Sequence, residues 1–254
     1  MSIFKMYQTI YLSYSLVPLV YVIFFLGTTG FISTFAQLES VNQSPLIQRI
    51  VNPVDEMVPI IETNDSKIVI VEFGDYQCIH CANFNMNDKD LLISEYVDTG
   101  QASYMFKDFP VNDRDDKLST LAAEASYCAA EQNMYWEYHD ELFRNTERNT
   151  NQNWVTIENL NEFAKNIGVD DGRDFEDCLN SHKYLRLVEE NESLAMDLGL
   201  PSTPSFIITN ANGTSTTNNN TKFDENMILM IGEHPYTDFG EAIAQINDMN
   251  NKSA

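Results

Sequence analysis

Basic side chains are scarce in this sequence. Lysine and arginine number 15 against 38 aspartate and glutamate residues, and the formal net charge is −23 at pH 7. Binding to nucleic acid or to an anionic membrane surface depends on clusters of basic side chains that neutralise phosphates. The composition therefore argues against both partners, and we interpret the acidic excess as a surface that keeps the protein soluble.

Cysteine is also infrequent, and its four positions are unevenly spaced. Cys78 and Cys81 form a Cys-x-x-Cys pair, whereas Cys128 and Cys178 stand apart. A structural zinc site needs four ligands, and the chain has neither a second such pair nor further histidines at ligand spacing. We therefore expect no metal site and interpret the pair as a redox-active dithiol. A permanent disulfide and half of a zinc site are the alternatives.

Charge is missing altogether from residues 10–36, a stretch rich in Leu, Val, Ile, Phe and Tyr. Its 27 residues exceed the roughly 20 that cross a bilayer as a helix. The length favours a transmembrane anchor with a cytoplasmic N-terminus at 1–9, because Lys5 is the only charge before it. The alternative is a signal segment cleaved after Thr34-Phe35-Ala36. Either interpretation delivers the rest of the chain outside the cytoplasm, where disulfides persist.

The chain beyond this segment is typical of a tether followed by an α/β domain. Residues 37–62 are polar with scattered prolines, which predicts the tether. The remainder alternates short apolar runs, typical of strands, with segments that carry apolar residues at helical spacing. We predict strands at 68–73, 102–106, 205–209 and 227–231. We predict helices from the cysteine pair to Gly100 and at 118–129, 131–144, 156–166, 171–180, 182–198 and 236–249.

The cysteine pair follows a predicted strand and opens a predicted helix, which gives it a specific chemistry. Unpaired N–H groups and the dipole at a helix N-terminus stabilise an anion, so the first cysteine, Cys78, ionises more readily than a free thiol. Cys81 lies one turn later and can close a disulfide that exchanges with another protein. We expect His80, between the two, to stabilise the Cys78 thiolate and make the disulfide a stronger oxidant. The alternative is an exposed histidine without a role.

Two motifs resemble those of DsbA-type thiol–disulfide oxidoreductases. The run Val71–Cys81 is similar to their active-site strand and motif, and Gly199–Phe206 is similar to their cis-proline loop. Phe106–Pro110 and the helix around 125–136 also resemble this family. The similarity covers about residues 66–249. It implies a thioredoxin fold in two parts, at 63–112 and 200–250, with a helical domain inserted at 113–199.

The resemblance also implies roles for single residues. Cys78 would be the exposed nucleophile and Cys81 its shielded partner. Pro204 would follow a cis peptide bond, and the Thr203 backbone would pair with an extended substrate segment; the alternative is an ordinary proline that starts a strand. Glu72 matches the family's buried acid, which would exchange protons with Cys81 from a carboxyl of raised pKa. The alternative for Glu72 is a glutamate that faces water.

Two further positions bear on the family pattern. Members commonly have proline after the first cysteine, whereas this chain has Ile79, and this pair of central residues tunes the redox potential. Some members carry a second, structural disulfide in the helical insertion, which implies a bond between Cys128 and Cys178. Without that bond, both would pack as small buried hydrophobic residues.

Together these features predict an enzyme that oxidises the cysteines of exported proteins. It would need no cofactor besides its own Cys78–Cys81 disulfide, and a membrane partner would re-oxidise it. The alternatives from other classes are a membrane-tethered module that binds extended peptides and a metal carrier that uses both thiols.

Overall fold

The computed structural model describes residues 45–56, 58, 60–62, 66–148, 154–169, 172–211 and 226–253. The chain separates into two compact units, Met1–Glu39 and Ser40–Ala254, and all described residues belong to the second. The predicted cytoplasmic N-terminus and membrane segment at 1–36 lie outside the described residues. Within the described ranges, no helix has both the length and the apolar character needed to cross a bilayer.

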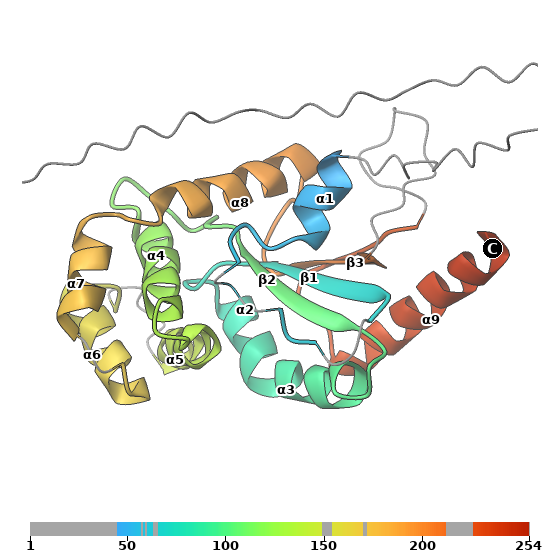
Figure 1. Ribbon diagram of the computed structural model, residues 1–254, viewed down its shortest axis with the longest axis horizontal. Coiled ribbons are helices and arrows are strands. Elements are labelled where there is room, and N and C mark those ends of the chain that lie inside the picture. Colours follow the sequence, from blue (N-terminus) through green and yellow to red (C-terminus); the bar gives the residue numbers. More distant parts are fainter. Residues whose placement is uncertain are drawn as a thin grey trace, which may run out of the picture. The chain divides into compact units, whose positions relative to one another are not determined.

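A four-stranded mixed sheet lies at the centre of this unit (Figure 1). Its strands are β1 (Ile68–Gly74), β2 (Ser103–Asp108), β3 (Ser205–Asn210) and β4 (Ile228–Ile231), in the order β2-β1-β3-β4. β1 runs parallel to β2 and antiparallel to β3, and β4 runs antiparallel to β3. The predicted strands are all present, with ends shifted by one or two residues, and the α/β architecture is confirmed.

The central strand β1 is buried along its whole length because helices cover both faces of the sheet. Val69, Val71 and Phe73 point to one face, where they pack with α1 (Pro45–Val51) and α8 (Leu185–Leu198). Figure 1 shows α1 and α8 on this side of the sheet and α2, α3 and α9 on the other.

Helix α1 differs from the expected tether. Its Ile47 and Ile50 are buried against the sheet, and the segment after it is held by Lys107, whose ammonium donates to the Asn52 carbonyl at 2.7 Å. Apolar residues at helical spacing within an otherwise polar segment account for the difference. The part of the predicted tether at 45–56 is therefore part of the folded domain.

On the opposite face, the helix that begins after Cys78 packs beside α9 (Tyr236–Ser253). This helix comprises α2 (Ile79–Phe84), α3 (Asp90–Leu92) and two π-helical stretches, Asn85–Lys89 and Ile93–Val97. Phe84, Phe206 and Phe239 form aromatic pairs that join α2, β3 and α9. These contacts fix the start of α2, and with it the cysteine pair, against the sheet.

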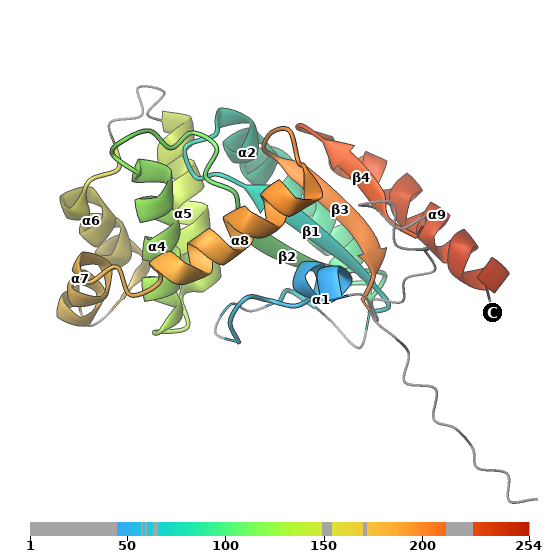
Figure 2. The ribbon, with the colours of Figure 1, turned by 90° about the horizontal axis from the view of Figure 1, so that it is seen from above.

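The helices between β2 and β3 form a group with its own core, seen beside the sheet in Figure 2. They are α4 (Leu118–Ala130), α5 (Tyr135–Arg148), α6 (Ile157–Ile167), α7 (Gly172–Asn180) and α8, which runs from this group onto the sheet. A disulfide joins Cys128 of α4 to Cys178 of α7. A buried cluster ties α4 and α8 to β2, because Asp108 accepts hydrogen bonds from Tyr127 at 2.5 Å and Asn191 at 3.1 Å.

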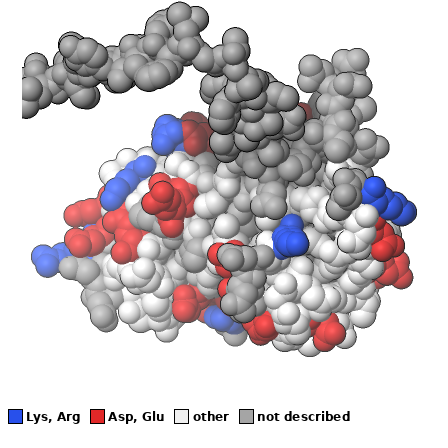
Figure 3. All heavy atoms as spheres, turned by 45° about the vertical axis from the view of Figure 1, so that its right-hand side comes forward, with Lys and Arg blue, Asp and Glu red and all other residues white. Residues whose placement is uncertain are grey.

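Charged side chains are interspersed over the surface. On the face shown in Figure 3, the basic side chains of the described residues lie apart from one another among acidic and uncharged ones. The negative net charge is therefore a diffuse field rather than a single patch on this face.

Candidate active site

The cysteine pair lies where the loop after β1 enters α2, and a buried carboxylate shapes that loop. Asp75 is 2% exposed and accepts hydrogen bonds from the backbone N–H groups of Gln77 and Asn112, both at 2.7 Å. Burial raises the pKa of Asp75 to about 6. The Cys78 N–H donates a hydrogen bond to the Asp75 carbonyl at 2.9 Å, which closes the turn before α2. Asp75 was not among the predicted site residues, although an aspartate at the first position of a turn between a strand and a helix is a recognisable signal.

Cys78 is placed as a stabilised thiolate. It is the residue immediately before the first turn of α2, 8% exposed, and its thiol donates to the Thr203 carbonyl at 3.4 Å. A hydrogen bond from the Cys81 thiol is the main cause that lowers the pKa of Cys78 to about 6. Burial opposes this shift, while the Thr203 side chain and the backbone N–H groups of Cys81 and His80 add to it.

Cys81 has the opposite character. It is fully buried, and this burial is the main reason why the pKa of Cys81 lies well above its usual range. The hydrogen bond to Cys78, the charge of Cys78 and the charge of Glu72 raise the pKa of Cys81 further. Both cysteines are free thiols in this structure. At neutral pH the pair therefore consists of one thiolate, at Cys78, and one thiol that donates to it.

The loop before β3 lies directly over the pair. The Thr203–Pro204 peptide bond is cis, and the Thr203 carbonyl contacts the Cys78 sulfur. On the other side of the loop, the Pro204 carbonyl accepts from the Gly232 N–H at 2.8 Å. The fold thus brings together two motifs that are far apart in the sequence.

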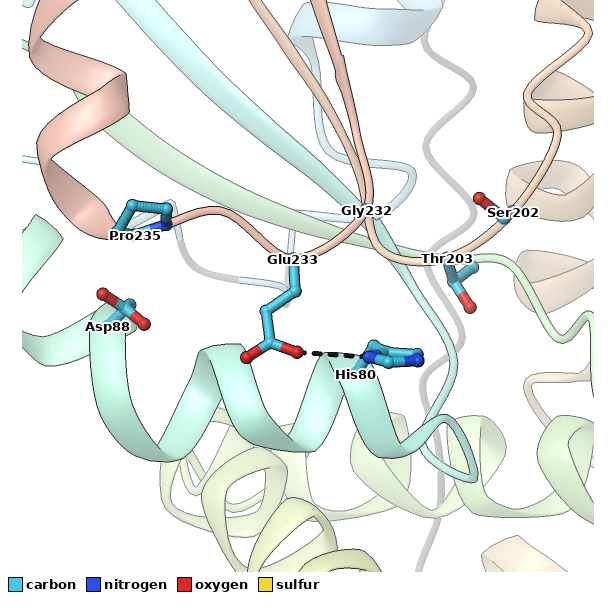
Figure 4. Close-up of a pocket in the computed structure, with 7 residues that line it drawn as sticks. All are labelled: His80, Asp88, Ser202, Thr203, Gly232, Glu233 and Pro235. Carbon is cyan, nitrogen blue, oxygen red and sulfur yellow. Dashed lines mark hydrogen bonds and ion pairs between the residues drawn. The ribbon is translucent and has the colours of Figure 1, made fainter.

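The hydrogen bond of the His80 imidazole goes to a partner that the sequence did not predict. Its Nδ1 bonds to Oε2 of Glu233 at 3.1 Å (Figure 4). Asn83 donates to the same oxygen at 3.3 Å. His80 contributes to the lowered pKa of Cys78 through its backbone N–H rather than its imidazole. The helical position of His80, two residues after Cys78, projects its ring toward the loop after β4.

Glu72 is a buried acid beneath the pair. It is 1% exposed, which excludes the water-facing alternative, and its Oε2 accepts from the Tyr104 hydroxyl. Burial raises the pKa of Glu72 to about 8. The hydrogen bond from Tyr104 and the charge of Lys89 lower this pKa, and the charge of Cys78 raises it. Oε1 of Glu72 has no hydrogen-bond partner among the described residues. A carboxyl in this state holds a proton at neutral pH.

We expect Glu72→Gln to stabilise the protein increasingly as pH rises. The folded protein keeps the Glu72 proton up to pH of about 8, whereas the unfolded chain releases it near 4.5. Wild-type stability therefore falls with rising pH between those values, and the neutral glutamine removes this loss. Urea unfolding of both forms at several pH values measures the difference. A constant difference across that window would contradict a buried, protonated Glu72.

Two acidic residues that the sequence did not single out share a cavity with His80 and Thr203. Asp88 and Glu233 line a cavity of about 590 Å³ together with His80 and Thr203 (Figure 4). They come from the helix after Cys78 and from the loop after β4, and no motif or spacing in the sequence connects them. Only the packing of β4 and α9 on the sheet brings them together.

Comparison with known proteins agrees with this geometry. A family model described as thioredoxin matches residues 55–226, well over half of the chain. The chain belongs to the thioredoxin family. Within it, the chain is a protein disulfide oxidoreductase of the DsbA type, as its resemblance to that group predicts.

Its relatives include two proteins of Bacillus species. The chain is 25% identical over 150 residues to disulfide bond formation protein D of Bacillus subtilis, an alignment that covers 59% of this chain and 67% of the relative. It is 29% identical over 146 residues to the probable disulfide bond formation protein D of Bacillus anthracis, covering 57% and 66%. The chain thus spans about two thirds of the length of these relatives.

Solved structures show the same fold. Wolbachia pipientis alpha-DsbA1 superimposes with a TM-score of 0.61 at 23% identity, covering 80% of this chain and all of that one, 100%. Oxidised BdbD from Bacillus subtilis gives a TM-score of 0.60 at 23% identity, covering 75% and 92%. At this level of identity the comparison establishes the thioredoxin-like fold.

Proposed function

We propose that this oxidoreductase works as an oxidase outside the cytoplasm, passing its Cys78–Cys81 disulfide to cysteine pairs of exported proteins. The observation that carries the proposal is the unequal environment of the two sulfurs. Hydrogen bonds from Cys81, Thr203 and the start of α2 lower the pKa of Cys78, whereas complete burial raises that of Cys81. Stabilising the Cys78 thiolate stabilises the reduced protein, and a pair that is stable when reduced is a strong oxidant.

The proposed reaction begins from the oxidised protein. A substrate thiolate attacks the Cys78 sulfur, which forms a mixed disulfide and breaks the Cys78–Cys81 bond. Cys81 leaves with the electron pair and takes a proton, which we assign to the raised-pKa carboxyl of Glu72. A second substrate thiolate then attacks the substrate sulfur, forming the substrate disulfide and releasing Cys78 as a thiolate. Two electrons have moved from the substrate to the protein.

Thr203 and Pro204 would position the substrate in this reaction. The Thr203 carbonyl lies against Cys78, and the chain turns there into β3. An extended substrate segment that pairs with the Thr203 backbone would present its cysteine to Cys78. The released dithiol needs an oxidant, and we propose a membrane protein that accepts the two electrons.

The sequence supports the location. The uncharged stretch at 10–36 would anchor the catalytic domain on the outer side of the membrane, or direct its secretion if it is cleaved. The relatives' role, as their names state it, is disulfide bond formation. The described residues contain no group of three or more His, Cys, Asp or Glu side chains arranged to hold a metal ion.

A redox titration of the full-length chain against glutathione at several pH values tests the oxidase. Because the pKa of Cys78 is lowered from 9.0 to about 6, the reduced form gains stability above pH 6 and loses this gain as pH falls through 6. At pH 7 the equilibrium constant for reduction is about tenfold larger than with an ordinary thiol, which makes the reduction potential about 30 mV more positive. The potential should fall by about 59 mV per pH unit below pH 6 and by about 30 mV per unit above it. A single slope up to pH 8 would show an ordinary Cys78 thiol and contradict the proposal.

A further inference from the structure

The cavity beside the cysteine pair has a one-sided charge. Asp88 and Glu233 line it, and none of the described residues that do so is lysine or arginine. Figure 4 shows the Glu233 carboxylate reaching from the loop after β4 toward the helix, between Asp88 and His80. The cavity adjoins the redox centre through Thr203, which lines the cavity and contacts the Cys78 sulfur with its carbonyl.

Each of the two carboxylates has an oxygen available to a ligand. Oε2 of Glu233 bonds to His80 and Asn83, and Oδ1 of Asp88 accepts from the Tyr236 N–H at 2.9 Å. None of these hydrogen bonds uses Oε1 of Glu233 or Oδ2 of Asp88. The Glu233 side chain is 35% exposed, so a ligand can reach it.

Thr203 adds a third polar group to the lining of the cavity. The residue is only 7% exposed, and its buried hydroxyl oxygen accepts no hydrogen bond from the described residues. A hydroxyl that donates to the Cys78 thiolate still has two acceptor lone pairs. A buried polar atom left in this state is stabilised by any donor that arrives with a ligand.

We propose that this cavity receives a lysine or arginine side chain of the substrate, placed next to the cysteine that is oxidised. Glu233 and Asp88 are then specificity-determining residues, and their carboxylates accept from the ammonium or guanidinium group. The proposal rests on the proposed oxidase and names its preferred substrates, which are cysteine-containing segments with a neighbouring positive charge.

A local site must be distinguished from the general negative charge of the protein. The net charge of −23 attracts any cationic peptide at long range, and this attraction is screened over about 10 Å at 0.1 M salt. A change of one charge anywhere on the surface alters the long-range field similarly. Only a change inside the cavity alters direct contacts with the substrate side chain.

The test compares three dithiol peptides that differ at one position beside the first cysteine, where they carry lysine, glutamine or glutamate. Oxidation rates are measured with the pre-oxidised full-length chain at 0.15 M salt. We expect the lysine peptide to react about two- to fivefold faster than the glutamine peptide, as partly exposed ion pairs allow, and the glutamate peptide to react more slowly. Glu233→Gln and Asp88→Asn should each move the lysine-to-glutamine ratio toward one.

The matched controls are Glu241→Gln in α9 and Asp90→Asn in α3, which remove one exposed carboxylate each from outside the cavity. They should keep the wild-type ratio. Binding of the same peptides with serine in place of cysteine, followed by fluorescence anisotropy, gives a readout without redox chemistry. Peptides that are oxidised and bound without regard to charge would overturn the cavity assignment and leave the oxidase intact. Preferential binding of the lysine peptide without oxidation would overturn the oxidase and leave the assignment intact.

Discussion

Replacing Cys78 with serine will abolish the oxidation of a dithiol peptide, leaving the rate of exchange without enzyme. A serine hydroxyl stays protonated at neutral pH and forms no disulfide, whereas the thiol it replaces has a pKa of about 6. Removing the sulfur thus removes both the attacked atom and the group whose ionisation favours the reduced form. No neighbouring thiol can substitute, because Cys81 is fully buried.

The matched variant is Cys81→Ser, which lacks the same disulfide but keeps the Cys78 sulfur. It should accumulate a mixed disulfide between Cys78 and a substrate, because the thiol that would resolve it is missing. Non-reducing electrophoresis and intact mass measure both outcomes on the full-length chain. A Cys78→Ser protein that still oxidises peptide, or a Cys81→Ser protein that forms its adduct elsewhere, would refute the assignment of the nucleophile.

The second large effect is expected on stability. Replacing Cys128 and Cys178 together with alanine should lower the free energy of unfolding by about 4 kcal/mol, the entropic value for a loop of this length. The bond spans 50 residues and joins α4 to α7, so it restricts much of the helical insertion in the unfolded chain. Both residues are buried, at 2% and 6% exposure, so imperfect packing of alanine will add to this loss.

This effect is measured by urea unfolding in a Cys78→Ser/Cys81→Ser background, where the structural bond is the only one left to reduce. Adding reductant to that background should reproduce the loss seen with the alanine pair. The alanine pair on the wild-type redox centre should still oxidise peptide under native conditions, because neither residue lines the cavity beside Cys78. Equal stability with and without the bond would show that α4 and α7 are held by packing alone.

The sequence was most informative where structure is local. The strand at 68–74, the turn and the helix that starts at Ile79 lie within a few residues of one another, so hydrophobic pattern and the cysteine spacing were enough to predict them. The resemblance to a known family added Thr203, whose carbonyl the structure places against Cys78, and Pro204, which follows a cis peptide bond. It also singled out Glu72, whose burial follows from its position on a strand covered on both faces.

Prediction failed where the deciding contact is distant. The tether at 37–62 was wrong over 45–56 because the apolar side of α1 only gains stability once the sheet is there to pack against. His80 was expected to act on the thiolate through its imidazole, but its side chain bonds to Glu233, 153 residues away in sequence. A local sequence pattern cannot predict a hydrogen-bond partner that is distant in the sequence.

The sequence by itself determined the α/β class, the strand and helix order and the chemical nature of the redox centre, because these depend on periodicity and on residues close in the chain. Tertiary structure alone decided which groups surround the two sulfurs. The pKa values of Cys78 and Cys81 diverge because one meets converging hydrogen-bond donors and the other a dry interior. The acidic cavity arises in the same way, since Asp88 and Glu233 meet only when β4 and α9 close over the helix that follows Cys78.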